Sequence, residues 1–256
     1  MKHRLGIVLS GGGARGVAHA GVLKALTEHG IQVDCIAGSS SGALVGALYA
    51  AGYSSDEMLE FFVERNPFRL SYLAVGKPGW IDTSKVAADF RDYFPQDSFE
   101  SLGKRLFVTA TDILNGELAI FQSGPLIAAV LASCSVPLVF TPTTIGDRQY
   151  SDGGIINNFP VEPLKGRCNA IIGVYASPIR AAHQTSLKSS FAVWQRAFEV
   201  GNYFAARTKF EQCDLVLCPE PLSEYGFFDT KHIERIFEIG YRAALAKMEM
   251  LERLRG

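Results

Sequence analysis

The chain has 256 residues, 48% of them hydrophobic, and a formal net charge of −1 from 25 Lys and Arg against 26 Asp and Glu. A chain of this length and composition can bury one large core, so we expect a single domain over residues 1–256. The balanced charge, without a block of basic residues, excludes the usual footprint of a nucleic-acid-binding protein. The five cysteines are scattered and form no C-x-x-C pair, which indicates reduced thiols and predicts no metal site.

Two segments resemble targeting or membrane sequences only superficially. The apolar run at 5–9 is too short for a secretory signal and ends in glycines, so we expect a cytoplasmic protein. Residues 35–53 carry no charge, but serines and glycines interrupt the apolar run, and this argues against a membrane span.

The pattern along the chain is mainly an alternation of strands and helices. Short apolar runs rich in β-branched residues predict buried strands, and apolar residues at helical spacing predict the helices between them. In the first part of the chain we expect, in order, a strand at 4–10, a helix at 17–29, a strand at 31–38, and helices at 42–52, 54–64 and 83–93. A hairpin of strands at 104–114 and 116–124 should follow, and then a helix at 125–136 and a strand that ends at Asp152. The last elements that we expect are a strand at 169–177 and helices within 191–205 and 233–251.

Some of these stretches allow a structural and a functional interpretation. Residues 66–82 are loop-like and contain several aromatic side chains, so they form either a surface excursion packed on the core or a mobile cover over an apolar pocket. The apolar faces within 191–205 and 233–251 fit a core or dimer contact, or a helix that lies on a membrane surface.

A glycine motif, GGGARG at 11–16, follows the first strand and opens a helix, and its spacing matches G-x-G-x-x-G. A dinucleotide-binding fold also places an acid at the carboxyl end of the second strand. Asp34 has about the right distance in sequence but lies before or inside that strand, so the match is partial. In either case the backbone N–H groups of the loop suit a pyrophosphate or an oxyanion.

A second motif, GSSSG at 38–42, lies between a strand and a helix, the context of a nucleophile elbow. The nucleophile of such an elbow stands on a strained turn that leaves no room for side chains two residues away on either side. Ser40 alone has glycine at both positions, so we predict it as the nucleophile. Ser39 and Ser41 are interpreted as structural hydroxyls, with Ser41 as a candidate helix cap.

A nucleophilic serine needs a base. Among the five histidines, His183 has the best position in sequence and His19 lies near the glycine loop, but neither sits in an evident loop after a late strand. A carboxylate can replace the imidazole when it reaches the hydroxyl. Asp152, in YSDGG at a strand end, is the leading candidate, and Asp112 in TATDIL competes with it.

The ordered set GGGARG, GSSSG and DGG resembles the patatin-like phospholipases, in particular the bacterial members, over about residues 4–176. Further stretches that fit are RGVAHAGVLKAL, ASCSVPLVF and SDGGIINNFPV. The resemblance implies a three-layer α/β/α fold with a mainly parallel central sheet, and a Ser-Asp dyad that cleaves acyl esters of lipids without a cofactor or metal. By motif position it implies Ser40 as nucleophile, Asp152 as base, Gly11, Gly12 and Gly13 as the oxyanion loop, and Arg15 as the basic, substrate-binding residue of that loop.

We therefore predict a hydrolase of the phospholipase, lysophospholipase or esterase type. Its partners would be a lipid or acyl-ester substrate and, transiently, the inner face of the membrane. Two alternatives stay open at this point: a nucleotide-binding oxidoreductase that uses GGGARG, and a catalytically silent, membrane-associated regulator with the same fold. The sequence does not specify the ester, the position cleaved or the oligomeric state.

Overall fold

The computed structural model describes residues 4–64, 70–182 and 187–255. Within this part of the chain, eight strands form one sheet in the order β5-β6-β3-β2-β1-β7-β8, with β4 paired to β3. Strands β3, β2, β1, β7 and β8 are parallel, whereas β4 and β6 run antiparallel to β3, and β5 antiparallel to β6. The strands span Leu5–Leu9 (β1), Cys35–Ser39 (β2), Arg105–Asp112 (β3), Glu117–Phe121 (β4), Thr143–Ile145 (β5), Arg148–Asp152 (β6), Ala170–Val174 (β7) and Leu215–Leu217 (β8).

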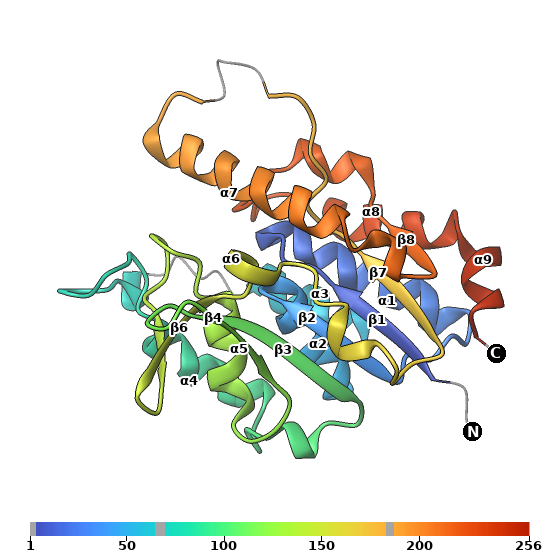
Figure 1. The fold of residues 1–256 in the computed structure, drawn as a ribbon, viewed down its shortest axis with the longest axis horizontal. Coiled ribbons are helices and arrows are strands. Elements are labelled where there is room, and N and C mark those ends of the chain that lie inside the picture. Colours follow the sequence, from blue (N-terminus) through green and yellow to red (C-terminus); the bar gives the residue numbers. More distant parts are fainter. Residues whose placement is uncertain (1–3, 65–69, 183–186, 256) are drawn as a thin grey trace.

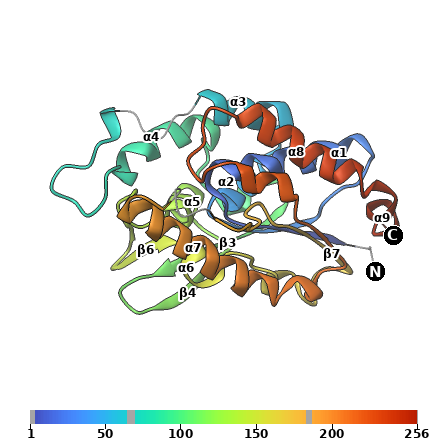
Figure 2. The same cartoon turned by 90° about the horizontal axis from the view of Figure 1, so that it is seen from above.

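Helices cover both faces of this sheet. Figure 2 shows α1, α2, α3 and α8 on one face and α6 and α7 on the other, and Figure 1 shows α7 extending away from the body of the molecule. The helices span Val17–Glu28 (α1), Ser41–Ala50 (α2), Ser55–Glu64 (α3), Thr83–Tyr93 (α4), Leu126–Cys134 (α5), Gly154–Asn157 (α6), Ser190–Arg207 (α7), Ile233–Leu245 (α8) and Met248–Arg253 (α9). The arrangement confirms the predicted three-layer α/β/α fold with a mainly parallel sheet.

Two hydrophobic clusters hold the layers together. Side chains of neighbouring strand residues point to opposite faces, so Ile7 and Leu9 of β1 enter the larger cluster under α1 and α2 while Val8 enters the smaller one. Phe159 and Tyr175 fill much of that smaller cluster, which lies on the side of α7. Both faces of the central strands are thus buried, and this explains why they are almost continuously apolar.

Several predicted boundaries agree with the structure, and others differ. The helix expected at 83–93 matches α4, and the Ser54 amide donates to Glu57 Oε2 (2.8 Å) at the start of α3, as the capping box predicts. The second strand begins at Cys35 rather than at residue 31. The helix within 191–205 is α7, but it is a partly exposed cover and not a core helix, because Ala206 is its only buried residue among those described.

No helix in the described ranges combines the length and the apolar character needed to span a membrane.

Candidate active site

Ser40 stands on a strained turn between β2 and α2. Its backbone has φ 52° and ψ −129°, a conformation that costs a non-glycine residue free energy and that is typical of functional sites. The glycines on both sides are required by close packing. A Cβ on Gly38 would lie 2.6 Å from the carbonyl oxygen of Gly42, and a Cβ on Gly42 would lie 2.2 Å from the carbonyl oxygen of Leu9. The turn therefore has the geometry of a nucleophile elbow.

The register of the sheet places Asp152 beside this turn. Ser39, at the end of β2, is paired with Thr109 of β3, and Asp152, at the end of β6, is paired with the next residue, Ala110. Strand β6 continues along the edge of β3 where β2 stops, so the two strand ends meet. The Ser40 hydroxyl donates to Asp152 Oδ2 at 2.6 Å.

Asp152 is buried, and within the described part of the chain its carboxylate accepts two hydrogen bonds. The Gly154 amide donates to Oδ1 at 2.7 Å, and the Ser40 hydroxyl donates to Oδ2. Burial raises the pKa of this carboxyl to about 7, although both hydrogen bonds act in the opposite direction. A carboxylate with a pKa near neutrality is a much stronger base than an exposed one and is suited to remove a proton at physiological pH.

The glycine loop passes directly over the nucleophile. A Cβ on Gly11 would lie 3.0 Å from the Cβ of Ser40, so the backbone approaches as closely as it can. The Gly11 amide donates to the carbonyl of Asn158 at 3.2 Å, whereas no residue of the described ranges accepts a hydrogen bond from the amides of Gly12 and Gly13. Gly13 has φ +59°, which favours glycine. Two of the three predicted oxyanion donors are thus free to bind an anion.

Arg15 is buried and does not reach the nucleophile. Its guanidinium forms a 2.8 Å ion pair with Glu199 of α7, and its Nε donates to the Gly12 carbonyl at 3.3 Å. The Phe227 ring lies 5.9 Å from the guanidinium carbon. These contacts join the glycine loop to α7 through the Arg15 side chain, and its role as a substrate-binding residue stays a prediction.

The competing acids and bases lie elsewhere. His19 bonds the Ser10 carbonyl at 2.8 Å, and burial lowers its pKa to about 4. Asp112 accepts from Asn115 at 2.9 Å and pairs with Arg148 at 3.0 Å, and the bond from Asn115 is the largest cause that holds its pKa below the usual range. His183 lies outside the described residues.

Asp34, the acid that a dinucleotide site would need, lies at the wrong edge of the sheet. Its carboxylate accepts from the Leu5 amide at 2.9 Å, at the amino end of β1, whereas the glycine loop follows the carboxyl end of the same strand. Among the described residues no group of His, Cys, Asp and Glu side chains has the arrangement of a metal site.

A deep apolar cavity of about 170 Å³ opens beside Ser40. It lies between the glycine loop, α2, α4, α5 and the segment around Phe227 and Phe228. Most of the side chains that line it are aliphatic or aromatic, among them Leu44, Phe61, Phe90, Leu131, Val136 and Phe140. A cavity of this composition binds a hydrocarbon chain and offers little to a charged or strongly polar ligand.

Comparison with known proteins decides the family. The model of the family described as patatin-like phospholipase matches residues 7–165, which include the glycine loop, the elbow and Asp152. The chain belongs to the patatin-like phospholipase family.

Two curated relatives illustrate the similarity in sequence. An uncharacterized NTE family protein of Mycobacterium tuberculosis is 38% identical over 166 residues, covering 64% of this chain and 46% of the relative. The lysophospholipase NTE1 of Debaryomyces hansenii is 33% identical over 167 residues, covering 63% of this chain and 11% of the relative. This patatin-like chain thus spans about half the length, or less, of these curated relatives.

A solved structure supports the fold. The crystal structure of VipD from Legionella pneumophila superimposes with a TM-score of 0.55 at 14% sequence identity, covering 99% of this chain and 67% of that chain. At this identity the likeness concerns the arrangement of the elements alone.

Some residues around the patatin-like site were not identified from the sequence. Ser133 of α5 accepts the Ser40 amide through its hydroxyl at 2.8 Å, and Asn158 accepts the Gly11 amide through its carbonyl. Both lie in stretches that carried the family resemblance, ASCSVPLVF and SDGGIINNFPV, but no local pattern indicated their partners. Ser41 is not a cap as expected: it is the first residue of α2, and its hydroxyl has no hydrogen-bond partner among the described residues.

Proposed function

We propose that the chain is a lipid acyl-ester hydrolase that uses a dyad of Ser40 and Asp152. The observation that carries the proposal is the 2.6 Å hydrogen bond from the Ser40 hydroxyl, on a strained elbow, to the buried carboxylate of Asp152. Ser40 also lines the apolar cavity. Membership of the patatin-like phospholipase family supports a lipid substrate.

The first half-reaction transfers the acyl group to the enzyme. Ser40 Oγ attacks the carbonyl carbon while its proton passes to Asp152 Oδ2. The carbonyl oxygen becomes an oxyanion, which would accept hydrogen bonds from the amides of Gly12 and Gly13. Removal of one such donor typically costs about 10²–10³ in rate. The tetrahedral intermediate then collapses: the bond to the alcohol oxygen breaks, Asp152 returns the proton to that oxygen, and Ser40 keeps the acyl group.

The second half-reaction restores the enzyme. A water molecule attacks the carbonyl carbon, its proton passes to Asp152, and the bond to Ser40 Oγ breaks as that oxygen regains a proton. The acyl chain occupies the apolar cavity throughout, so a longer chain buries more apolar surface and binds more tightly, by roughly 0.8 kcal/mol for each CH₂ group that is removed from water.

We also propose that the segment 70–82 touches the membrane that holds the substrate. Its exposed side chains include Val75, 86% exposed, and Trp80, 53% exposed. The Trp80 ring lies 5.4 Å from the ring of Phe191 on α7, where Val193 is exposed as well, so apolar groups from two elements share this region. Exposed apolar groups of this density indicate an interaction surface.

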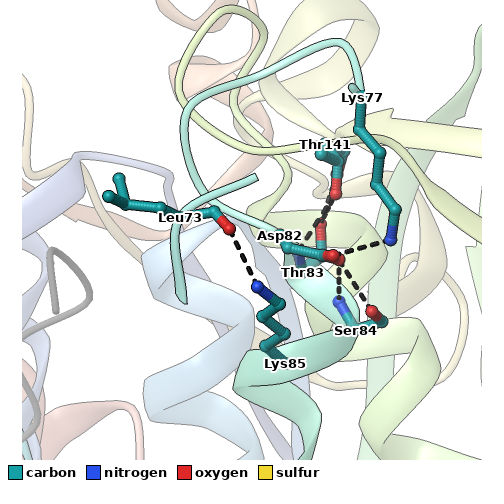
Figure 3. A network of polar contacts seen from close by, with 7 residues as sticks. All are labelled: Leu73, Lys77, Asp82, Thr83, Ser84, Lys85 and Thr141. Atoms are coloured by element: carbon teal, nitrogen blue, oxygen red, sulfur yellow. Dashed lines mark hydrogen bonds and ion pairs between the residues drawn. The ribbon is translucent and has the colours of Figure 1, made fainter. Parts of the chain in front are cut away.

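A polar network holds the segment in place at its base (Figure 3). Asp82 accepts from the Lys77 ammonium at 2.6 Å and from the Ser84 amide at 3.1 Å, which caps α4. The Lys85 ammonium donates to the Leu73 carbonyl at 2.9 Å. The segment thus stands on the start of α4, whose residues line the apolar cavity. The segment therefore lies beside the cavity. Residues 66–69, which belong to the predicted surface excursion or cover, lie outside the described residues.

The function is tested by the release of fatty acid from phospholipid and lysophospholipid in mixed micelles, with wild type, Ser40→Ala and Asp152→Asn. We expect release by the wild type and a loss of about 10³-fold or more in each variant. Equal release by the wild type and Ser40→Ala would contradict the dyad, and a folded wild type without release from any lipid or synthetic ester would favour the silent regulator.

Flotation with anionic and neutral vesicles tests the membrane contact: Val75→Asp should reduce binding, and Ser40→Ala should leave it unchanged.

A further inference from the structure

Ser40 borders a second, much smaller cavity, of about 10 Å³. Its lining shares only Ser40 and Phe227 with the lining of the apolar cavity. The other residues that line it are the glycines Gly11 and Gly12, the ring of Phe198, and five polar side chains: Asp152, Asn158, Ser177, Glu199 and Asn202. A space of this size suits a single water molecule, provided that two to four of these polar groups can bond to it.

Three polar side chains from separate parts of the chain, that of Asp152 among them, converge on the Cα of Gly154. The position that a Cβ on Gly154 would occupy lies 2.9 Å from Asp152 Oδ1, 2.9 Å from Asn158 Oδ1 and 3.3 Å from Asn202 Nδ2. Asp152 ends β6, Asn158 follows α6, and Asn202 belongs to α7. Residue 154 is a glycine and has no side chain, so no Cβ occupies this point between the three polar groups.

The position of Asn202 is not explained by a hydrogen bond to any residue that the structure describes. No residue of the described ranges exchanges a hydrogen bond with its amide group, whereas Asn158 donates to the Gly11 carbonyl at 3.4 Å. A partly buried amide that faces a base and lacks a protein partner has its donors and its acceptor available for a bound water molecule.

The ion pair between Glu199 and Arg15 fixes α7 against the glycine loop. The two atoms are 2.8 Å apart, both side chains are largely buried, and Gln195 also donates to Glu199 at 3.2 Å. Glu199 lies one helical turn before Asn202, so both face the cavity from the same side of α7. The pair therefore sets the position of the Asn202 amide relative to Ser40 and its oxyanion donors.

We propose that the small cavity holds the water molecule that releases the acyl group from Ser40, and that Asn202 is the positioning residue that orients this water. The inference rests on the proposed function. The water oxygen attacks the acyl carbon as Asp152 takes one of its protons. The bond from the acyl carbon to Ser40 Oγ breaks, the proton passes from Asp152 to that oxygen, and a fatty acid leaves. Phe198 and Phe227 line the same space, and its volume of about 10 Å³ suits water better than a larger alcohol. The proposal therefore favours hydrolysis over acyl transfer.

The test separates the two half-reactions with a medium-chain p-nitrophenyl ester. Rapid mixing measures acylation from the nitrophenol burst, and acid quench followed by intact-protein mass measures the acyl-enzyme. In Asn202→Ala we expect a burst rate constant within about twofold of the wild type and a deacylation rate constant that falls about 10²-fold, because the nucleophile is misplaced. The acyl-enzyme should accumulate. Arg207→Ala, an exposed change on the same helix, should behave as wild type in both steps.

A second readout uses added methanol. Asn202→Ala enlarges the cavity, so we expect the ratio of methyl ester to fatty acid to rise severalfold over the wild type. Asn202→Asp, which keeps the size of the side chain, puts a second negative charge beside Asp152 and should move the midpoint of deacylation to higher pH. Equal effects on both half-reactions, or no effect on either and no change in the product ratio, would overturn the inference. A wild type that forms no acyl-enzyme would instead contradict the proposed function.

Discussion

Asp152→Asn should stabilise the protein relative to the wild type, by an amount that depends on pH. The pKa of Asp152 is raised from 3.8 to about 7 in the folded state, because burial disfavours the charged form. A raised pKa means that the folded state holds its proton more tightly than the unfolded state. The resulting stability is fully present below the unfolded value near pH 4 and is lost as the pH rises through 7.

The variant has no carboxyl at this position and does not suffer this loss. Between pH 5 and pH 8 the free energy of unfolding of Asp152→Asn should therefore rise relative to the wild type by about 2–3 kcal/mol. For a chain of this length, the melting temperature of Asp152→Asn minus that of the wild type should accordingly be higher at pH 8 than at pH 5, by roughly 5–10 °C.

Urea and thermal denaturation at several pH values measure this difference. Asp112→Asn is the matched control, since Asp112 is equally buried but has its pKa below the ordinary range, so it is charged throughout pH 5–8 in both states. Its difference from the wild type should be independent of pH over that range. A difference for Asp152→Asn that is also constant from pH 5 to pH 8 would refute the raised pKa and with it the basis for Asp152 as a base near neutrality.

Other predictions concern the reaction, the elbow and the cavity. The kcat/KM of ester hydrolysis should rise with pH and level off with a midpoint near 7, because Asp152 must be unprotonated to accept the serine proton; a flat profile from pH 5 to 8 would argue against it. Gly42→Ala should lower the free energy of unfolding by about 1–3 kcal/mol or more, because the new Cβ would lie 2.2 Å from the Leu9 carbonyl oxygen. The control Gly201→Ala has open space around the new Cβ, so it should leave the free energy of unfolding unchanged or raise it by about 0.5–1 kcal/mol. Urea denaturation measures both changes. Val136→Phe should shift the preference of folded enzyme to shorter acyl chains in a chain-length series of p-nitrophenyl esters, and an unchanged preference would place the acyl chain elsewhere.

The sequence allowed most of the fold to be predicted, together with two side chains, Ser40 and Asp152, that the structure joins by a hydrogen bond. The reason is local: the elbow requires glycine at residues 38 and 42, and the alternation of buried runs is typical of parallel strands. The strand that ends in Asp152 was expected, but its partner was not, because register with β3 is a long-range property. Short elements such as β5, β8 and α6 carry too few residues for a periodic pattern and were missed.

The surroundings of the dyad depend on contacts between distant residues. Arg15 was expected to bind substrate, yet its partner is Glu199, 184 positions away, and no local signal links the two. Gly11 looked equivalent to Gly12 and Gly13, but the Asn158 carbonyl occupies its amide.

The most direct test of the central claim is covalent labelling with a long-chain fluorophosphonate, followed by intact-protein mass and peptide mapping. We predict one adduct on Ser40 in the wild type, formed as the phosphorus–fluorine bond breaks, much slower labelling of Asp152→Asn, and none of Ser40→Ala. An adduct that maps to another residue, or labelling of Ser40→Ala at the rate of the wild type, would contradict the assignment of Ser40 as the nucleophile.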